Sequence, residues 1–140
     1  MHGDIRFSVP NTPGRLAQAA RVLGDAGVNI GGIGCDLRPG EKWGFIHFQV
    51  DDVEKAVRAL EATGHEILDV HEVERVQIED RPGALAELCQ SYNDRGDNIE
   101  VLYVGTDNHI IVGTESMRKP FYGRRMDQTT YTDRRTSTES

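Results

Sequence analysis

The side chains that most often act in catalysis or bind metal ions, histidine and cysteine, are few in this chain and widely spaced. The five histidines are His2, His47, His65, His71 and His109. No two of them have the HxxxH or HxH spacing that directs two ligands at one metal ion, and Cys35 and Cys89 form no CxxC motif. No set of Ser, His and Asp, or of Cys and His, stands at a spacing typical of a catalytic site. The sequence therefore favours a protein that is not an enzyme and has no metal or other cofactor.

Three closely spaced glycines, Gly31, Gly32 and Gly34, superficially suggest a phosphate-binding loop. The GxGxxG fingerprint needs a strand-to-helix turn and a third glycine, but these residues follow a helix and Leu37 occupies the third position. We therefore reject a nucleotide site. Gly31 and Gly32 interrupt the alternation of a strand, which predicts a β-bulge or the close approach of another backbone.

An internal repeat organises the chain. With an offset of 69, Pro-Gly-Arg-Leu-Ala at 13–17 falls on Pro-Gly-Ala-Leu-Ala at 82–86. The same offset places Gly27 on Gly96, Asn29 on Asn98 and Ile30 on Ile99, and residues 5–30 match without a gap. The chain therefore contains two copies of one unit.

The first copy predicts a β-α-β-β-α-β unit, the ferredoxin-like order. Alternating Ile5, Phe7 and Val9 predict a strand, and apolar residues at helical spacing over 16–26 predict a helix that ends at Gly27. Strands are expected after Gly27, over 43–50 and over 65–70. A second helix lies between the last two, with Asp51 as its cap and Glu54 at the capping-box distance.

The second copy has the same beginning but a shorter end. Strands are expected over 74–78, after Gly96 and over 109–112, with a helix marked by Leu85, Leu88, Cys89 and Tyr92. No second amphipathic helix or closing strand follows. We expect an α+β protein of two ferredoxin-like units packed as a pseudo-dimer: residues 1–71, an incomplete unit at 72–116, and a disordered tail at 117–140.

Composition and charge argue against several classes of partner. Of the 140 residues, 37% are hydrophobic and 28% charged, which suits a soluble domain with a modest core. The net charge is −7, and residues 117–140 carry six Arg and Lys against three acids, so the part before them is about −10. An acidic body disfavours nucleic-acid binding. No apolar run approaches the ~20 residues of a membrane span. No signal peptide is visible either, so we expect a cytoplasmic protein.

A strand ending in Asn/Asp-x-Pro-Gly, an amphipathic helix and then Gly-x-Asn-Ile together resemble an ACT domain. These motifs are residues 11–14 with 27–30 and residues 80–83 with 96–99, and the resemblance covers roughly residues 4 to 115. It implies a small regulatory module that binds an amino acid or similar ligand. It also implies that two units pair, side by side or sheet to sheet, with the ligand at their interface, and that two tandem chains can dimerise.

By position, the resemblance places the ligand contacts in the two strand–helix loops and at the start of the strand after each helix. The candidate residues are Asn11, Thr12, Pro13, Gly14, Asn29, Ile30, Asp80, Arg81, Pro82, Gly83, Asn98 and Ile99. Helix N-termini suit a carboxylate, and Asn both donates and accepts hydrogen bonds. Asp80 would instead favour an ammonium group, so the two sites would differ. Asn11 and Asp80 equally fit a helix-cap role, and Asn29 and Asn98 a local backbone role.

The leading hypothesis for function is a non-catalytic module that senses an amino acid and modulates a metabolic enzyme or transporter. The alternative is an interaction or scaffold protein without a ligand, which uses the same fold to dimerise or to bind a partner subunit. Exposed apolar sheet surface on the shortened second unit would favour association. Under either hypothesis we expect a homodimer, with neither nucleic acid nor membrane as a partner.

Overall fold

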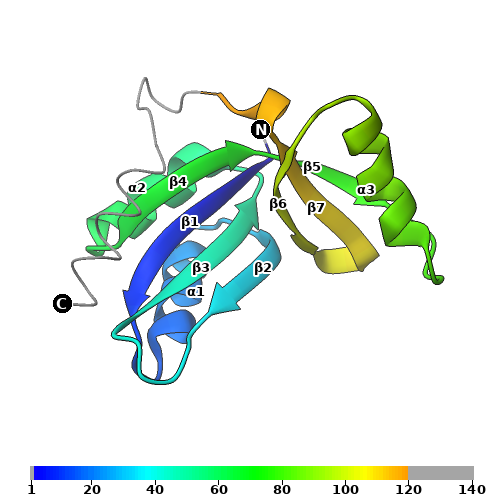
Figure 1. Ribbon diagram of the computed structural model, residues 1–140. Helices are drawn as coiled ribbons and strands as arrows, with labels where there is room; N and C mark the ends of the chain where they lie inside the picture. Colours follow the sequence, from blue (N-terminus) through cyan, green and yellow to red (C-terminus); the bar gives the residue numbers. More distant parts are fainter. Residues whose placement is uncertain (1, 120–140) are drawn as a thin grey trace.

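The computed structural model describes residues 2–119 as two antiparallel sheets and three α-helices (Figure 1). A four-stranded sheet with helices α1 and α2 forms the first unit, and a three-stranded sheet with helix α3 forms the second unit. The protein is therefore an α+β fold of two ferredoxin-like units, with the second shortened, as the sequence predicted. Met1 and residues 120–140, which include most of the predicted tail, lie outside the described residues.

The first unit has the complete ferredoxin-like topology. Its elements are β1 (Gly3–Pro10), α1 (Arg15–Asp25), β2 (Ile30–Asp36), β3 (Trp43–Val50), α2 (Val53–Ala62) and β4 (Glu66–Glu72). The strand order is β2-β3-β1-β4, and all neighbouring strands are antiparallel. Both helices lie behind this sheet in Figure 1, so we call the opposite side its helix-free face.

The core of the first unit lies between this sheet and its two helices. Ile5, Phe7 and Val9 of β1 are buried there, and Phe7 meets Phe48 edge-on with 5.3 Å between ring centroids. Every second residue of a strand faces the same side, so the polar residues between them face the helix-free side. The alternation seen in the sequence therefore determines which side chains can form a site outside the core.

The second unit repeats the first up to its third strand. Its elements are β5 (Glu74–Gln77), α3 (Ala84–Asp94), β6 (Ile99–Val104), β7 (His109–Thr114) and two short 3-10 turns, η1 (Thr106–Asn108) and η2 (Glu115–Met117). The strand order is β5-β7-β6. Strand β5 corresponds to β1 in the repeat but pairs only with β7, whereas β1 pairs with both β3 and β4. Up to residue 119 the second unit has no counterpart of α2 and β4.

The helix ends correct two predictions. The N-cap of α1 is Gly14, with φ 89° and no side-chain cap, and Gly83 (φ 88°) caps α3 in the same way. A cap role for Asn11 is therefore wrong, and Asp80 caps no helix either. Helix α2 is capped by Asp52 rather than Asp51, because the Asp52 carboxylate accepts the Lys55 N–H at 3.2 Å. The sequence analysis therefore placed the cap of this helix one residue too early, at the first of two adjacent aspartates.

The two units meet where β2 and β6 approach each other. Gly32 and Gly105 form an isolated antiparallel bridge. A Cβ atom on Gly32 would lie 3.0 Å from the Tyr103 ring, and one on Gly105 would lie 2.5 Å from the Gly31 carbonyl oxygen. The pairing of β2 with β3 also shifts register between Ile30 and Gly32. The bulge and the close backbone approach expected from the paired glycines are both confirmed.

Candidate functional site

The helix-free face of the first unit carries charged side chains in register. Directly opposed residues of antiparallel strands lie on the same face, with their Cβ atoms about 5 Å apart. The pairing places Arg6 between His47 and Asp69, and Asp4 between Gln49 and His71. These two rows, spread over β3, β1 and β4, form the surface on which the second unit rests.

A buried carboxylate joins the two units at the centre of this face. The Asp4 side chain is only 2% exposed, and both of its oxygens accept hydrogen bonds. Oδ2 lies 2.8 Å from His47 Nδ1, and Oδ1 accepts the Tyr103 hydroxyl from β6 at 2.6 Å. Burial, with the nearby Asp4 charge, raises the pKa of Tyr103, so its hydroxyl remains a donor. Asp4 thus orients one side chain from each unit.

A second charged network closes one end of the junction. The fully buried His71 contacts Glu100 through Nε2 at 2.8 Å and the Glu72 carbonyl through Nδ1 at 2.7 Å. Arg118, beyond β7, donates to Glu100 at 3.0 Å and to both oxygens of Asp69 at 2.9 and 3.0 Å. Burial alone would raise the pKa of Glu100, but the hydrogen bonds from His71 and Arg118 outweigh it and lower that pKa. The Glu100 carboxylate therefore stays ionised.

Arg75 of β5 connects the units at the β2–β6 contact. Its guanidinium donates to the Gly31 carbonyl at 2.9 Å and to the Gln49 side chain, both in the first unit. It also donates to the Thr106 carbonyl at 2.9 Å and hydroxyl at 3.1 Å. One planar cation thus fixes the position of β2 relative to the turn after β6.

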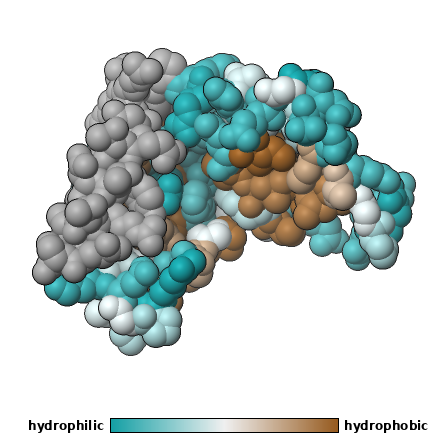
Figure 2. Space-filling view, viewed as in Figure 1, coloured by the Kyte–Doolittle hydropathy of each residue, from teal (hydrophilic) through white to brown (hydrophobic). Residues whose placement is uncertain are grey.

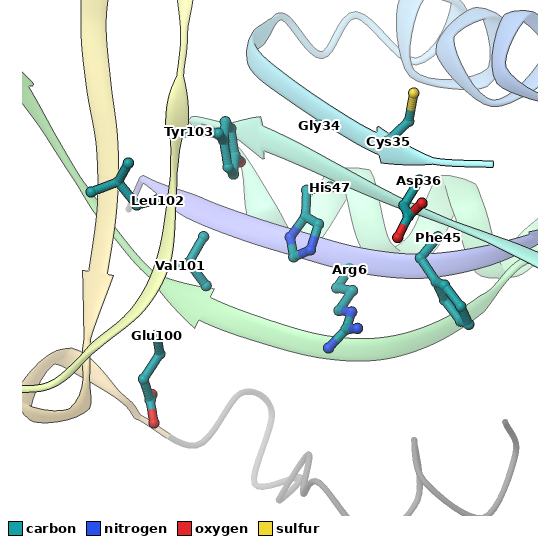
Figure 3. A pocket seen from close by; sticks show the side chains of 10 residues that line it. All are labelled: Arg6, Gly34, Cys35, Asp36, Phe45, His47, Glu100, Val101, Leu102 and Tyr103. Atoms are coloured by element: carbon teal, nitrogen blue, oxygen red, sulfur yellow. The ribbon is translucent and has the colours of Figure 1, made fainter. Parts of the chain in front are cut away.

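Beside these contacts a cleft of about 330 Å³ opens between the helix-free face and β6 (Figure 3). We call it the inter-unit cleft. Arg6, Phe45 and His47 project into it from one face of the first unit, and Cys35 points to the other side of β2 from Asp36 (Figure 3). Its lining residues are Arg6, Gly34, Cys35, Asp36, Phe45, His47, Glu100, Val101, Leu102 and Tyr103. The cleft therefore combines both signs of charge with apolar side chains contributed by both units.

The surface beside the cleft is apolar on the side of the second unit. Figure 2 shows hydrophobic surface gathered over β6 and β7. Val104 is 61% exposed, and Leu102 is half-buried. Tyr103 contacts the first unit, so Leu102 and Val104, one position away along β6, lie on the opposite face of the second sheet and leave this apolar surface uncovered in the described chain.

None of the twelve residues expected from the loop motifs lines the inter-unit cleft. The Asn11 amide donates to the carbonyls of Arg38 at 2.7 Å and Glu41 at 2.9 Å, so it stabilises the turn between β2 and β3. Thr12 accepts from the Arg15 side chain at 3.0 Å, and Pro13 and Gly14 are exposed. In the first loop the side chain best suited to a ligand is therefore already engaged.

The second loop is likewise on the surface. Arg81 forms ion pairs with Glu79 at 2.7 Å and Glu87 at 2.6 Å, and these hydrogen bonds raise its pKa. The neighbouring residues Asp80, Pro82 and Gly83 are all exposed. The loop therefore presents Asp80 to solvent, next to an arginine whose charge is already paired.

Within each unit, the loop and the asparagine after the helix lie at opposite ends of the sheet. Register pairs Pro10 with Trp43 at one end of β3 and Ile30 with Val50 at the other. At about 3.3 Å per residue, the two ends are more than roughly 20 Å apart. In the first unit, Asn29 is exposed and Ile30 packs on the core. In the second unit, the Asn98 carbonyl accepts the Glu115 N–H at 2.9 Å, and Ile99 is half-buried. A single small ligand cannot contact both motifs of one unit.

Sequence reasoning missed the charged and aromatic residues that line the cleft. The only available signal was the alternation in β1 and β3, which turns Arg6 and His47 away from the core. Among residues 2–119, no cluster of three or more His, Cys, Asp or Glu is placed to hold a metal ion. No helix in the same range is long and apolar enough to cross a membrane.

Comparison with known proteins supports the fold. No family model and no curated protein matches the chain. Among solved structures it is similar to protein BT0572 from Bacteroides thetaiotaomicron, with TM-score 0.67 and 22% identity over 81% of this chain and 78% of the other. It is also similar to the ligand-free regulatory subunit of aspartate kinase from Thermus thermophilus, with TM-score 0.64 and 24% identity over 81% and 82%.

A third similarity is to the aspartokinase alpha and beta subunits, with TM-score 0.59 and 20% identity over 81% of each chain. These matches span both units rather than one. Similarity at this level of identity establishes a common arrangement of strands and helices. The chain therefore has the two-unit, ACT-like fold that is also found in the regulatory subunit of aspartate kinase from Thermus thermophilus.

Proposed function

We propose that the protein binds a small molecule with both a carboxylate and an ammonium group, an amino acid, in the inter-unit cleft. In this proposal it acts as a non-catalytic regulatory module for a metabolic enzyme in the cytoplasm. The observation that carries the proposal is the cleft itself. A volume of about 330 Å³ falls within the usual range of small-molecule sites, and residues of both units line it.

The charges in the cleft match the two ends of an amino acid. Arg6 and His47 are cross-strand neighbours that can face a carboxylate. Asp36 and Glu100 supply negative charge on the opposite strands β2 and β6. Both described hydrogen bonds to the Glu100 side chain end on Oε1, so Oε2 is available to accept from an ammonium group.

The position of the cleft supports a regulatory role. A ligand can shift a conformational equilibrium only if it binds the two states with different affinity. A ligand that contacts Arg6 in the first unit and Glu100 in the second would bind one arrangement of the units more tightly than others, because both contacts form only in that arrangement. The similarity to regulatory subunits of aspartate kinase favours an enzyme as the partner, and no reactive set of side chains in the described chain argues for catalysis.

The loop motifs remain a competing location for the same ligand. Thermal shift and calorimetry with the twenty common amino acids would test both. A ligand at 100 times its dissociation constant should stabilise the protein by about 2.7 kcal/mol. Asp36→Asn should weaken binding, whereas Asp80→Asn, which removes a carboxylate, also exposed, from the second loop, should not. If only Asp80→Asn weakens binding, the ligand binds at the second loop and not in the cleft. If no amino acid changes the melting temperature, the sensing function is refuted.

A second candidate function, association without a ligand, is supported by the open edge of the second unit. Within residues 2–119, β5 pairs on one side only, and Val76 is half-buried whereas its counterpart Phe7 is fully buried. We propose that this edge contributes to a homodimer. Light scattering should then give twice the monomer mass, and the negative charge introduced by Gln77→Glu should reduce it. A monomer at all concentrations would exclude this candidate.

A further inference from the structure

The imidazole of His47 has two nitrogens in different environments. Nδ1 lies 2.8 Å from Asp4 Oδ2, and the other Asp4 oxygen already accepts the Tyr103 hydroxyl at 2.6 Å. An ionised carboxylate can only accept, so Nδ1 carries a hydrogen. Asp4 and Tyr103, one from each unit, therefore hold the ring in one orientation.

The other nitrogen, Nε2, belongs to the part of the ring that lines the cleft (Figure 3). The His47 side chain is 27% exposed, and among the described residues Nε2 has no hydrogen-bond partner. With Nδ1 fixed as a donor, Nε2 accepts a hydrogen bond when the ring is neutral and donates one when the ring is protonated. The proton on Nε2 thus decides which end of a ligand His47 can bind.

Several titratable or charged groups contact this ring or line the same cleft. Asp4 and Arg6 approach it from β1, Asp36 lies on β2, and Glu100 and Tyr103 lie on β6. The ionised Asp4 favours the protonated ring, and Arg6, its cross-strand neighbour, opposes it. A carboxylate placed between Arg6 and Nε2 would cancel that opposition. Protonation of His47 and binding of a carboxylate should therefore support each other.

The apolar lining of the cleft narrows the class of ligand. Phe45 forms one apolar wall, and the Val101 side chain of β6 forms another (Figure 3). The Arg6 guanidinium lies 5.7 Å from the centroid of the Phe45 ring, so the charged and apolar walls adjoin. A side chain of a few carbon atoms attached to an amino-acid head group can contact both.

We infer that His47, oriented by Asp4 and Tyr103, binds the carboxylate of an amino acid with an apolar side chain, and that binding takes up a proton on Nε2. This inference rests on the proposed amino-acid function. His47 is in this view the residue that determines specificity for a carboxylate, and Asp4 and Tyr103 are positioning residues. Because the carboxylate binds the form of the ring that carries a proton on Nε2, affinity should fall with rising pH.

Three probes separate the parts of this recognition: L-leucine, L-leucinamide, which lacks the carboxylate, and 4-methylpentanoate, which lacks the ammonium group. Calorimetry at about pH 7.5, in two buffers with different ionisation enthalpies, measures the protons taken up. L-leucine should bind with net proton uptake. L-leucinamide should bind at least about tenfold more weakly, because a hydrogen bond between charged groups is lost. 4-Methylpentanoate should retain the proton uptake but bind more weakly than L-leucine.

Two substitutions separate the roles of the two nitrogens. The amide nitrogen of His47→Asn can occupy the position of Nδ1, and that of His47→Gln can occupy the position of Nε2. His47→Asn should therefore weaken L-leucine binding about tenfold near pH 6 and abolish proton uptake. His47→Gln should also abolish proton uptake but retain more of the affinity. His65→Asn is the control, because His65 contacts Thr63 outside the cleft, and it should leave both quantities unchanged.

The outcomes distinguish this inference from the proposed function. Equal binding of L-leucine and L-leucinamide, or unchanged proton uptake in His47→Asn, would overturn the role of His47 while leaving amino-acid sensing intact. Binding of another amino acid but not of L-leucine would overturn the assigned ligand class. Failure of all twenty amino acids to bind the wild-type protein would instead refute the proposed function itself.

Discussion

Removing the Tyr103 hydroxyl tests whether one hydrogen bond between the units contributes to the stability of the whole chain. Tyr103→Phe keeps the ring that packs against Gly32 but removes the donor to Asp4 Oδ1, 2.6 Å away. Hydrogen bonds to charged groups contribute about 1.5–3 kcal/mol. The Asp4 side chain is 2% exposed, so water cannot replace the lost donor easily. We expect the free energy of unfolding to fall by about 2 kcal/mol.

Urea unfolding monitored by circular dichroism measures this change, and Tyr92→Phe provides the matched control. The Tyr92 hydroxyl donates to Glu74, an exposed residue of the same unit, so its removal should cost less than about 1 kcal/mol. A double-mutant cycle of Tyr103→Phe with Asp4→Asn should give a coupling energy of about 1–2 kcal/mol. A loss below about 0.5 kcal/mol with no coupling would refute the conclusion that this bond holds the units together.

Three further predictions concern the same junction and its surroundings. Gly105→Ala should lower the free energy of unfolding by about 1–3 kcal/mol in urea, because its Cβ would lie 2.5 Å from the Gly31 carbonyl oxygen. Gly24→Ala, in α1 with nothing within 4 Å of the new Cβ, should raise it by about 0.5–1 kcal/mol. The lowered pKa of Glu100 contributes stability that is present above the ordinary glutamate pKa and lost as pH falls through the folded value. Between about pH 5 and about pH 3, the free energy of unfolding should therefore fall more in the wild type than in Glu100→Gln. Acid unfolding curves of the two proteins that run parallel would contradict this.

The sequence was sufficient to predict the repeat and the path of the chain within each unit. Alternation in β1 and helical spacing in α1 are local patterns, and Gly27 and Gly96 end their helices with φ 76° and 68°. The interrupted alternation at Gly31 and Gly32 even indicated a close approach, although not which strand would approach. Local patterns specify local structure because each depends on residues within one or two turns of the chain.

The resemblance implied a ligand at an interface between units, but the residues of the inter-unit cleft could not be predicted, because they are distant in sequence and meet only after the two units pack. Asp4 and Tyr103 are 99 residues apart, and His71 and Glu100 are 29 apart. The alternation in β1 shows that Asp4 and Arg6 face away from the core, but it contains no information about what covers them. Position in a family motif pointed instead to Asn11, whose amide is occupied by the turn that follows β2.

The chemistry of the junction explains why its geometry should respond to a charged ligand. Directional bonds to Asp4, Asp69, Glu100 and the Gly31 carbonyl cross between the units, alongside the packing of Ile111 on Gly32. Such bonds weaken steeply when their angles change, so a small rotation of one unit breaks several at once. Under the proposed function, a molecule that adds charge pairs in the cleft stabilises this arrangement of the two units by its own binding energy. Binding in the cleft and docking of the units would then be thermodynamically linked, and each should strengthen the other.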